Sequence, residues 1–321
     1  MTPARGPSTP VITAAPAITL RALKTHADYA ACVQLQRDTW GRDYADCVPA
    51  SVLKVSQLVG GVSGGAFTAD GRLVGFVYGL TGVRDGRLIH WSHMLAVAPD
   101  VRNHGVGRRL KEYQREVLRG HGIEMMYWTF DPLVARNAHL NLNRLGTVVQ
   151  EYVPDMYGDT GSELHAFGTD RFVVSWVVSP GAGKTTTPGR AEAPAGPDGV
   201  TGPAGVTGPA GVVGPDLSAR PEAAARGAPA SEAVWRAAPL VTGDNINGNG
   251  SGSGPAALVR IEIPVDVETM PLKDAQAWRE STRPAFVRLM SDGYRVSGFV
   301  TDDEAGCFYL LSRTDAGAGG R

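Results

Sequence analysis

The chain has 321 residues, 43% of them hydrophobic, which is enough for one or two domains with a substantial core. Its 31 basic and 32 acidic side chains give a net charge of −1, which excludes a general attraction to nucleic acid or anionic membranes. The three cysteines lack metal-ligand spacing and are expected to be incidental thiols in a reducing cytoplasm. No apolar run reaches 18 residues, so we expect no transmembrane helix.

The first 16 residues, broken repeatedly by proline, are predicted to be a disordered lead-in rather than a signal peptide. Strands and helices then follow one another up to about residue 178. In chain order we expect a strand over 18–23, helices over 26–40 and 49–59, a hairpin of strands 62–68 and 72–80, a strand over 87–97, a helix over 106–119, a strand over 124–130, a helix over 133–145, and strands over 147–153 and 171–178. In the first helix, Ala30, Val33 and Trp40 are expected to face the core.

The most informative stretch runs from Trp91 to Arg119. A continuous apolar run ending at Val97 is typical of a strand buried on both faces. A loop containing Gly105 and Gly107 then opens an amphipathic helix. The first-turn N–H groups of such a helix have no intrahelical partner, and the glycines let an anion approach them closely. The stretch therefore predicts a cradle for phosphate or pyrophosphate.

In this context Arg102-x-x-Gly105-x-Gly107 resembles the acyl-CoA signature of the GNAT acetyltransferase superfamily. The downstream blocks TFDP…RNAHLNLNRLG and GYRVSGF resemble an uncharacterised bacterial group of that superfamily with a C-terminal extension. The resemblance implies an α/β (α+β) GNAT fold over residues 17–179, with a mixed central sheet flanked by helices. It also implies acetyl-CoA, or another acyl-CoA, as co-substrate and no metal.

By the same resemblance, backbone groups of the loop hold the CoA pyrophosphate, and the strand before it pairs with pantetheine. Arg102 shapes the loop, while Arg108 or Arg109 either meets a CoA phosphate or belongs to a solvated helix face. Asn137 falls in the block that supplies a side chain to CoA. The expected cofactor-binding residues are Leu95, Ala96, Val97, Arg102, Asn103, His104, Gly105, Val106, Gly107, Arg108 and Asn137.

Three residues are candidates for catalysis, because the tyrosine that usually serves as acid is replaced here by Leu142. His93 is either the base or water relay for the acceptor amine, or a packed polar residue at a strand end. Asp131 either binds or deprotonates the acceptor, or caps the next helix. Tyr157 is the best replacement acid, with ordinary packing as the alternative. In a regular strand His93 shares a face with Leu95, and a bulge would change that parity.

Residues 180–255 are rich in Gly, Pro and Ala and are predicted to be a disordered linker. Seven Gly-x-y triplets between 196 and 216 leave a short collagen-like trimer as the alternative. Residues 256–313 form an expected β-α-β-β extension, too small to be comfortable alone and therefore docked on the first domain. Residues 314–321 are predicted to be a disordered tail.

The sequence thus favours a cytoplasmic N-acyltransferase that moves an acetyl or other acyl group to an amine by direct attack in a ternary complex. A small-molecule or peptide amine is the expected partner, without nucleic acid or membrane, and a homodimer stays open. The alternative is a degenerate, CoA-binding module with a regulatory or scaffolding role.

Overall fold

The structure is a computed structural model, and it describes residues 17–179 except 85, 159, 163 and 164, then residues 231–245, and residues 256–313 except 305. The expected N-terminal lead-in, the glycine triplets and the C-terminal tail lie outside the described residues. Within the described parts, no helix has the length and apolar character needed to cross a membrane.

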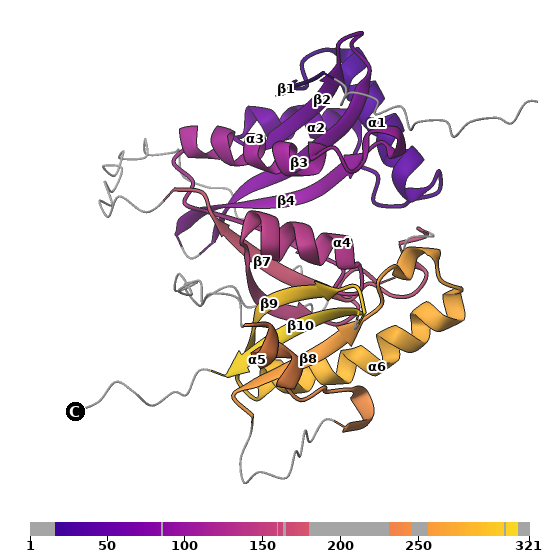
Figure 1. Ribbon diagram of the computed structural model, residues 1–321. Coiled ribbons are helices and arrows are strands. Elements are labelled where there is room, and N and C mark those ends of the chain that lie inside the picture. Colours follow the sequence, from indigo (N-terminus) through magenta and orange to yellow (C-terminus); the bar gives the residue numbers. More distant parts are fainter. Residues whose placement is uncertain are drawn as a thin grey trace, which may run out of the picture.

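A mixed seven-stranded sheet forms the first half of the protein (Figure 1). Its spatial order is β1-β2-β3-β4-β5-β7-β6, in which only β4 and β5 pair in parallel. The strands are β1 (Ile18–Ala22), β2 (Val62–Thr68), β3 (Leu73–Arg84), β4 (Arg87–Val97), β5 (Met125–Phe130), β6 (Val148–Val153) and β7 (Arg171–Val177). This is the mixed sheet that the sequence predicts, with β3 extended four residues beyond the expected end.

Helices cover both faces of the sheet. The α1/α2 face carries α1 (His26–Trp40) and α2 (Ala50–Leu58), with Trp40 packed edge-on against Phe76. The opposite face, called the α3 face, carries α3 (Val106–Gly120). Glycines let α3 lie close to the strands: a Cβ on Gly64 would lie 2.5 Å from the Tyr113 ring.

The buried side of α1 differs from the expected one. Ala30 is exposed and Val33 and Trp40 are half-buried, so the prediction of an inward Ala30 was wrong. Two polar side chains set the rotation of the helix instead. Asp28 closes a capping box with Thr25 and Gln36 bonds both backbone groups of Val48. Satisfied polar groups therefore occupy positions that apolar periodicity assigns to the core.

Pairing between β4 and β5 is short, and this positions the candidate site. Only three pairs join the two strands, and Trp91↔Tyr127 is the last of them. Beyond it the two strands no longer pair, although β4 continues to Val97. A β-bulge in β4 falls at the same level, because Tyr78 pairs with Met94 while Gly79 pairs with Ser92. The point just beyond the last pair, between Ser92 and Trp128, is called the vertex below.

The helix expected over 133–145 is divided. Its first turn is α4 (Ala135–Ala138), and the rest, His139–Leu145, is a π-helix closed by Gly146 in the left-handed conformation. The Asn141 side chain donates to the Asn137 carbonyl oxygen at 2.8 Å, while Thr147 bonds to the Asn141 carbonyl oxygen at 3.1 Å. These bonds satisfy backbone groups that the wider turn leaves free.

The C-terminal part is a three-stranded sheet, ordered β8-β10-β9, with one long helix beside it. Its elements are β8 (Leu258–Ile263), α6 (Leu272–Ser291), β9 (Tyr294–Asp302) and β10 (Gly306–Arg313). Figure 1 shows this orange and yellow unit against α4 and β7. Phe286 of α6 packs on Tyr152 and Phe172 of the large sheet and on Tyr309 of β10, with ring centroids 5.0–5.5 Å apart. One apolar core therefore joins the two units.

The linker expected over residues 180–255 contains one described segment. Residues 231–245 contain helix α5 (Glu232–Ala237), whose Trp235 is 5% exposed and packs 5.7 Å from the Phe308 ring. The Leu240 backbone forms an isolated bridge with Arg260 of β8. An Ala-rich composition concealed this short segment, which belongs to the C-terminal unit rather than to a disordered connector.

We predict that Phe286→Ala destabilises both units together. Truncating a fully buried aromatic ring costs about 3–5 kcal/mol of the free energy of unfolding. Because Phe286 contacts both sheets, chemical denaturation followed by tryptophan fluorescence should show one transition, shifted to lower denaturant. Val287→Ala, at a neighbouring side chain that is 44% exposed, is the matched control and should change stability by about 0.5 kcal/mol or less. A separate early transition that leaves the large sheet unaffected would contradict the shared core.

Candidate active site

The loop before α3 is built to present backbone N–H groups. Asn103 and Gly105 have φ values of 63° and 73°, a left-handed conformation that suits glycine and asparagine. Gly105 is the N-cap of α3, and no side chain caps the helix there. The first-turn N–H groups, from Val106 onward, are therefore left for water or an anion. Arg102 holds the loop closed by donating from Nε to the Val97 carbonyl oxygen at 3.1 Å.

The other polar side chains of this loop lie at the surface. His104 Nδ1 lies 2.8 Å from the Arg102 carbonyl oxygen, so the imidazole also supports the turn. Arg108 pairs with Glu112 at 2.8 Å on the exposed side of α3. Arg109 donates to the Ile18 carbonyl oxygen at 2.7 Å. The loop itself therefore supplies backbone donors, and the exposed arginines Arg102, Arg108 and Arg109 each have a partner within the chain.

The strand segment Leu95–Val97 leads directly into that loop. On one side it pairs with β3, where Val97 faces Gly75. On its other side no β5 residue is paired with it, because the last pair is Trp91↔Tyr127. Apart from the Val97 carbonyl oxygen, which accepts from Arg102, this edge of β4 is therefore open for hydrogen bonding to an extended ligand that follows the strand. A Cβ on Gly107 would meet Leu95 and Val97 at ordinary contact distances of 3.6 and 3.8 Å, so the start of α3 lies close beside this strand segment.

Asn137 and Leu142 lie on the helical segment that follows β5. Asn137 is half-buried, and its carbonyl oxygen accepts from Asn141. Leu142, which stands where a tyrosine was expected from the resemblance, packs against the apolar core. The predicted contact of the Asn137 side chain with CoA stays a prediction.

His93 occupies the bulge of β4 and faces the α1/α2 side. Its ring lies 6.0 Å from that of Tyr78, edge to face, so it has the parity of the bulge rather than that of a regular strand. Although the side chain is exposed, the protein groups around it desolvate the imidazole and lower its pKa. The carboxylate of Asp46 opposes this shift. The result is an imidazole that is neutral near pH 7 and open to a ligand.

Tyr157 approaches the same face from the segment after β6. Its hydroxyl lies 2.9 Å from Thr129 Oγ1, and Arg171 stands 5.4 Å from its ring centroid. Burial raises the pKa of the phenol, while the hydrogen bond to Thr129 and the charge of Arg171 act in the opposite direction. Thr129 alternates with Trp128 along β5, so Thr129 and Tyr157 share the side of His93.

Sequence reasoning missed a contact between two surface segments, one of which carries Tyr157. Residues 41–49 and the described part of 154–170 meet through the bond from Ala45 N–H to the Thr160 carbonyl oxygen at 3.3 Å. Tyr44 and His165 lie edge to face at 6.3 Å, and burial lowers the pKa of His165 to about 4. Asp46 belongs to the first segment and influences His93 electrostatically. No local motif marks these residues, because only the fold brings the two segments together.

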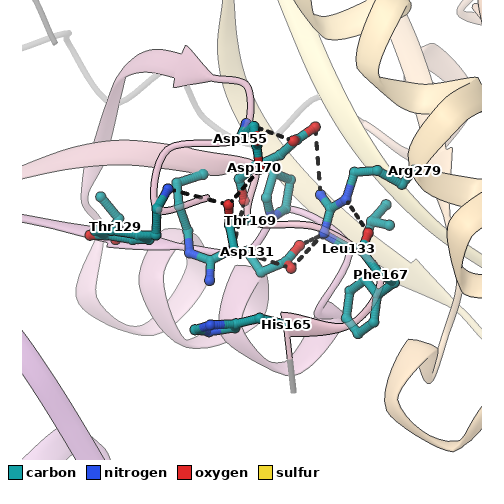
Figure 2. Close-up of polar contacts among 12 residues, drawn as sticks. Thr129, Asp131, Leu133, Asp155, His165, Phe167, Thr169, Asp170 and Arg279 are labelled. Atoms are coloured by element: carbon teal, nitrogen blue, oxygen red, sulfur yellow. Dashed lines mark hydrogen bonds and ion pairs between the residues drawn. The ribbon is translucent and has the colours of Figure 1, made fainter. Parts of the chain in front are cut away.

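Asp131 is part of a buried ion cluster rather than a free carboxylate (Figure 2). It is 8% exposed, and it accepts from Arg279 of α6 at 2.6 Å and from Arg171 at 3.5 Å. Its other oxygen accepts from the Leu133 N–H at 2.9 Å, before α4 begins. The N-cap of α4 is Val134 and carries no side-chain cap, so Asp131 does not cap that helix. Arg171 separates Asp131 from Tyr157, so the structure brings His93 and Tyr157 to one face and holds Asp131 behind them. Of the described residues, no three His, Cys, Asp or Glu side chains gather in a way that could hold a metal ion.

Solved structures that resemble this chain are acetyltransferases. The ribosomal-protein-S18-alanine N-acetyltransferase from Escherichia coli is 18% identical, with coverage of 52% of this chain and 97% of its own and a TM-score of 0.40. An acetyltransferase of the GNAT family from Streptococcus pneumoniae is 16% identical, with 50% and 99% covered and a TM-score of 0.41. An aminoglycoside 6'-N-acetyltransferase complexed with coenzyme A is 16% identical, with 51% and 98% covered and a TM-score of 0.39. A search of curated proteins finds no match.

These TM-scores are too low to carry an argument, so the assignment comes from the sequence family and the strand order. Residues 63–142 match the family model described as an acetyltransferase (GNAT) domain. The matched segment includes most of β2, all of β3, β4 and β5, and the loop that opens α3. This segment lies in a mixed sheet whose parallel strands β4 and β5 pair at one end only. Residues 63–142 therefore carry a GNAT acetyltransferase domain.

Proposed function

We propose that this protein is an N-acyltransferase that moves an acetyl or other acyl group from an acyl-CoA to an amine. The observation that supports this most strongly is the loss of β4–β5 pairing beside an uncapped helix N-terminus. The open strand edge leads directly to the anion cradle, so one extended ligand could contact both. A ligand with a pyrophosphate at one end and an extended amide arm fits both.

Each part of the site has a task in this proposal. The first-turn N–H groups of α3 receive the pyrophosphate, and the open edge of Leu95–Val97 offers backbone partners to the amides of the arm. When bound, an acyl-CoA supplies an activated thioester. The pyrophosphate cradle follows the C-terminal end of β4, so the reactive end of an arm along β4 would lie toward His93 and the vertex. Positioning of this kind converts a bimolecular step into an effectively unimolecular one.

The α1/α2 face provides the groups that an acceptor amine needs. Amines are protonated near pH 7 and attack a thioester only after losing that proton. His93 is exposed and has a lowered pKa, so it is available as the base or as a relay through water. Asp46, which is exposed in the neighbouring segment, attracts a cationic acceptor. Tyr157 lies on this same face, so its role is to orient the acceptor rather than to protonate the departing sulfur.

Asp131 has a supporting role in this scheme. Its carboxylate pairs with two buried guanidinium groups, those of Arg171 and Arg279. It fixes Arg171, which in turn lies beside the Tyr157 ring. Asp131 thus connects the C-terminal unit to the acceptor side without touching the reacting atoms.

A second function remains, because Leu142 replaces the expected acid. A CoA-binding module without catalysis would keep the cradle and lose turnover. Release of free thiol from acetyl-CoA, measured with a panel of amino acids, peptides and small amines, separates the two. Amine-dependent release supports the enzyme. Measurable binding of acetyl-CoA without release above the buffer rate for every amine would contradict it.

Gly105→Val is expected to lower the affinity for acetyl-CoA about tenfold or more. At φ 73° a β-branched residue is strained by about 1–2 kcal/mol, so the loop would change shape and withdraw its N–H groups. A Cβ there meets no atom within 4 Å, so the core packing stays intact. Gly122→Val is the matched control, because Gly122 has φ 71° and equally open space but follows the other end of α3. Calorimetry that shows equal affinities for the two variants would remove the loop from the binding site.

The pH dependence of kcat/KM should follow His93. A base must be neutral, so activity falls as pH decreases through its pKa, which burial holds below the usual value of about 6.5. Asp46→Asn removes the carboxylate that raises this pKa, so the acidic limb should move to still lower pH. His93→Gln should abolish the limb and lower kcat/KM by about 100-fold or more. An unchanged limb in His93→Gln would assign the proton transfer to another group.

A further inference from the structure

A fully buried lysine lies at the vertex, on the face opposite His93. Lys111 of α3 is 5% exposed and donates from Nζ to Ser92 Oγ of β4 at 2.7 Å. The same nitrogen stands 3.9 Å from the centroid of the Trp128 ring of β5. Ser92 and Trp128 are the first residues beyond the last β4–β5 pair, so the amine lies where the two strands begin to separate. Burial lowers its pKa well below the usual value for lysine.

A directed chain of hydrogen bonds fixes this amine in place. Thr81 donates its hydroxyl proton to the Gly60 carbonyl oxygen at 2.7 Å, so it accepts from His90 Nδ1 at 2.9 Å. His90 Nε2 then accepts from Gln114 Nε2 at 3.0 Å, and Gln114 Oε1 accepts from the Ser92 hydroxyl at 2.7 Å. With its proton committed in this way, Ser92 Oγ can only accept from Lys111. Burial lowers the pKa of His90 to about 3, so this imidazole stays neutral.

The residues that surround this series of hydrogen bonds leave space for it and hold its ends in place. A Cβ at Gly79 would lie 2.2 Å from His90 Nε2 and 2.8 Å from Gln114 Nε2, so only glycine leaves room for the two side chains. On the other side, Trp128 is held by its Nε1–H, which donates to Asn141 Oδ1 at 2.8 Å. Three elements of the fold therefore converge to position one amine. A lysine that served only to fill space would be replaced by an apolar residue at lower desolvation cost.

We propose that Lys111 is a catalytic residue that protonates the sulfur of the departing CoA thiolate. The proposal rests on the proposed function, which puts the thioester at the vertex. His93 and Lys111 then flank the reacting carbon from opposite faces of the sheet. This arrangement separates the incoming amine from the outgoing sulfur, as collapse of a tetrahedral intermediate requires.

The proton and electron balance of the step is complete. The acceptor nitrogen forms a bond to the carbonyl carbon, and its proton passes to His93 or through water. The carbon–sulfur bond breaks with its electron pair on sulfur, and the Lys111 ammonium transfers a proton to that sulfur. The products are the amide, CoA thiol, a neutral lysine and the proton held by His93 or water. After release, His93 gives that proton to solvent and Lys111 takes one back. The pKa of an ordinary lysine lies about 2 units above that of a thiol, so its ammonium is too weak an acid to protonate a thiolate efficiently. Burial lowers the pKa of Lys111 and reduces this difference.

The first test measures binding and titration without turnover. The chain has five lysines, so Lys111 can be assigned in NMR spectra of lysine-labelled protein by comparison with Lys111→Met. Its side-chain signal should titrate below the usual pKa of about 10.4. Adding CoA should shift that titration, while desulfo-CoA, which lacks the sulfur, should shift it less. An equal response to both ligands, or none, would overturn the contact with sulfur.

The second test measures turnover. Lys111→Met should bind acetyl-CoA within about threefold of wild type but lose about 100-fold or more in kcat, while the exposed Lys273→Met is the control. Wild-type activity should fall at alkaline pH as Lys111 loses its proton, and this limb should disappear in the variant. The neighbouring charged groups do not account for the alkaline limb. In α3, Arg115 lies over Trp176 and Arg108 pairs with Glu112, while His90 of β4 is neutral.

Ser92→Ala gives an independent check if Lys111→Met fails to fold. It removes the described acceptor of the ammonium, so the pKa of Lys111 and the alkaline limb should move to lower pH. An unmoved limb, or a Lys111→Met enzyme that keeps its kcat, would overturn the role of Lys111 while leaving the acyltransferase proposal intact. Absence of amine-dependent turnover in the wild type would overturn both.

Discussion

The separation of β4 from β5 is the constraint on which the rest of this structure depends. A sheet that stops pairing within its interior exposes backbone groups that must find other partners. Here the two strands pair only up to Trp91 and Tyr127, and a bulge at His93 changes the direction of the side chains at the same level. The strand then enters a loop whose left-handed Gly105 directs free N–H groups outward. An open edge and an anion cradle thus follow one another along eleven residues, 95–105, and both favour one extended, anionic ligand.

The C-terminal unit stabilises the end of the large sheet that carries Asp131 and Asp170. Burial alone would raise the pKa of Asp170, but hydrogen bonds from Arg283 and Tyr152 hold it below its usual range. Arg279 of the same helix takes the Asp131 carboxylate, and its own Nη1 is buried without a hydrogen-bond partner. Removing Arg279 would leave the buried Asp131 carboxylate without this partner, which costs several kcal/mol. The domain and its extension are therefore energetically coupled. The described side chains of the extension touch Asp131 and Asp170 rather than His93.

Sequence patterns predicted the elements well wherever apolar periodicity or glycine chemistry decides the local structure. Strand β4 has the predicted bounds, 87–97, and helix α3 begins at the predicted Val106. A buried apolar run defines the first and a glycine-containing loop defines the second. The inward side of α1 was predicted wrongly, because Asp28 and Gln36 are buried by partners distant in the sequence. The same limit hides Lys111: on a charged helix surface a lysine is expected to be solvated. Only the positions of Ser92 and Trp128 show that this one is not.

The central claim is that the reactive sulfur lies at the vertex between His93 and Lys111. A crystal structure with a non-hydrolysable acetyl-CoA analogue tests it most directly. The account predicts the pyrophosphate on the N–H groups of the Gly105 loop, the amide arm along Leu95–Val97, and the sulfur within hydrogen-bonding distance of Lys111 Nζ. A pyrophosphate elsewhere, or an arm that leaves β4 before the vertex, would contradict it.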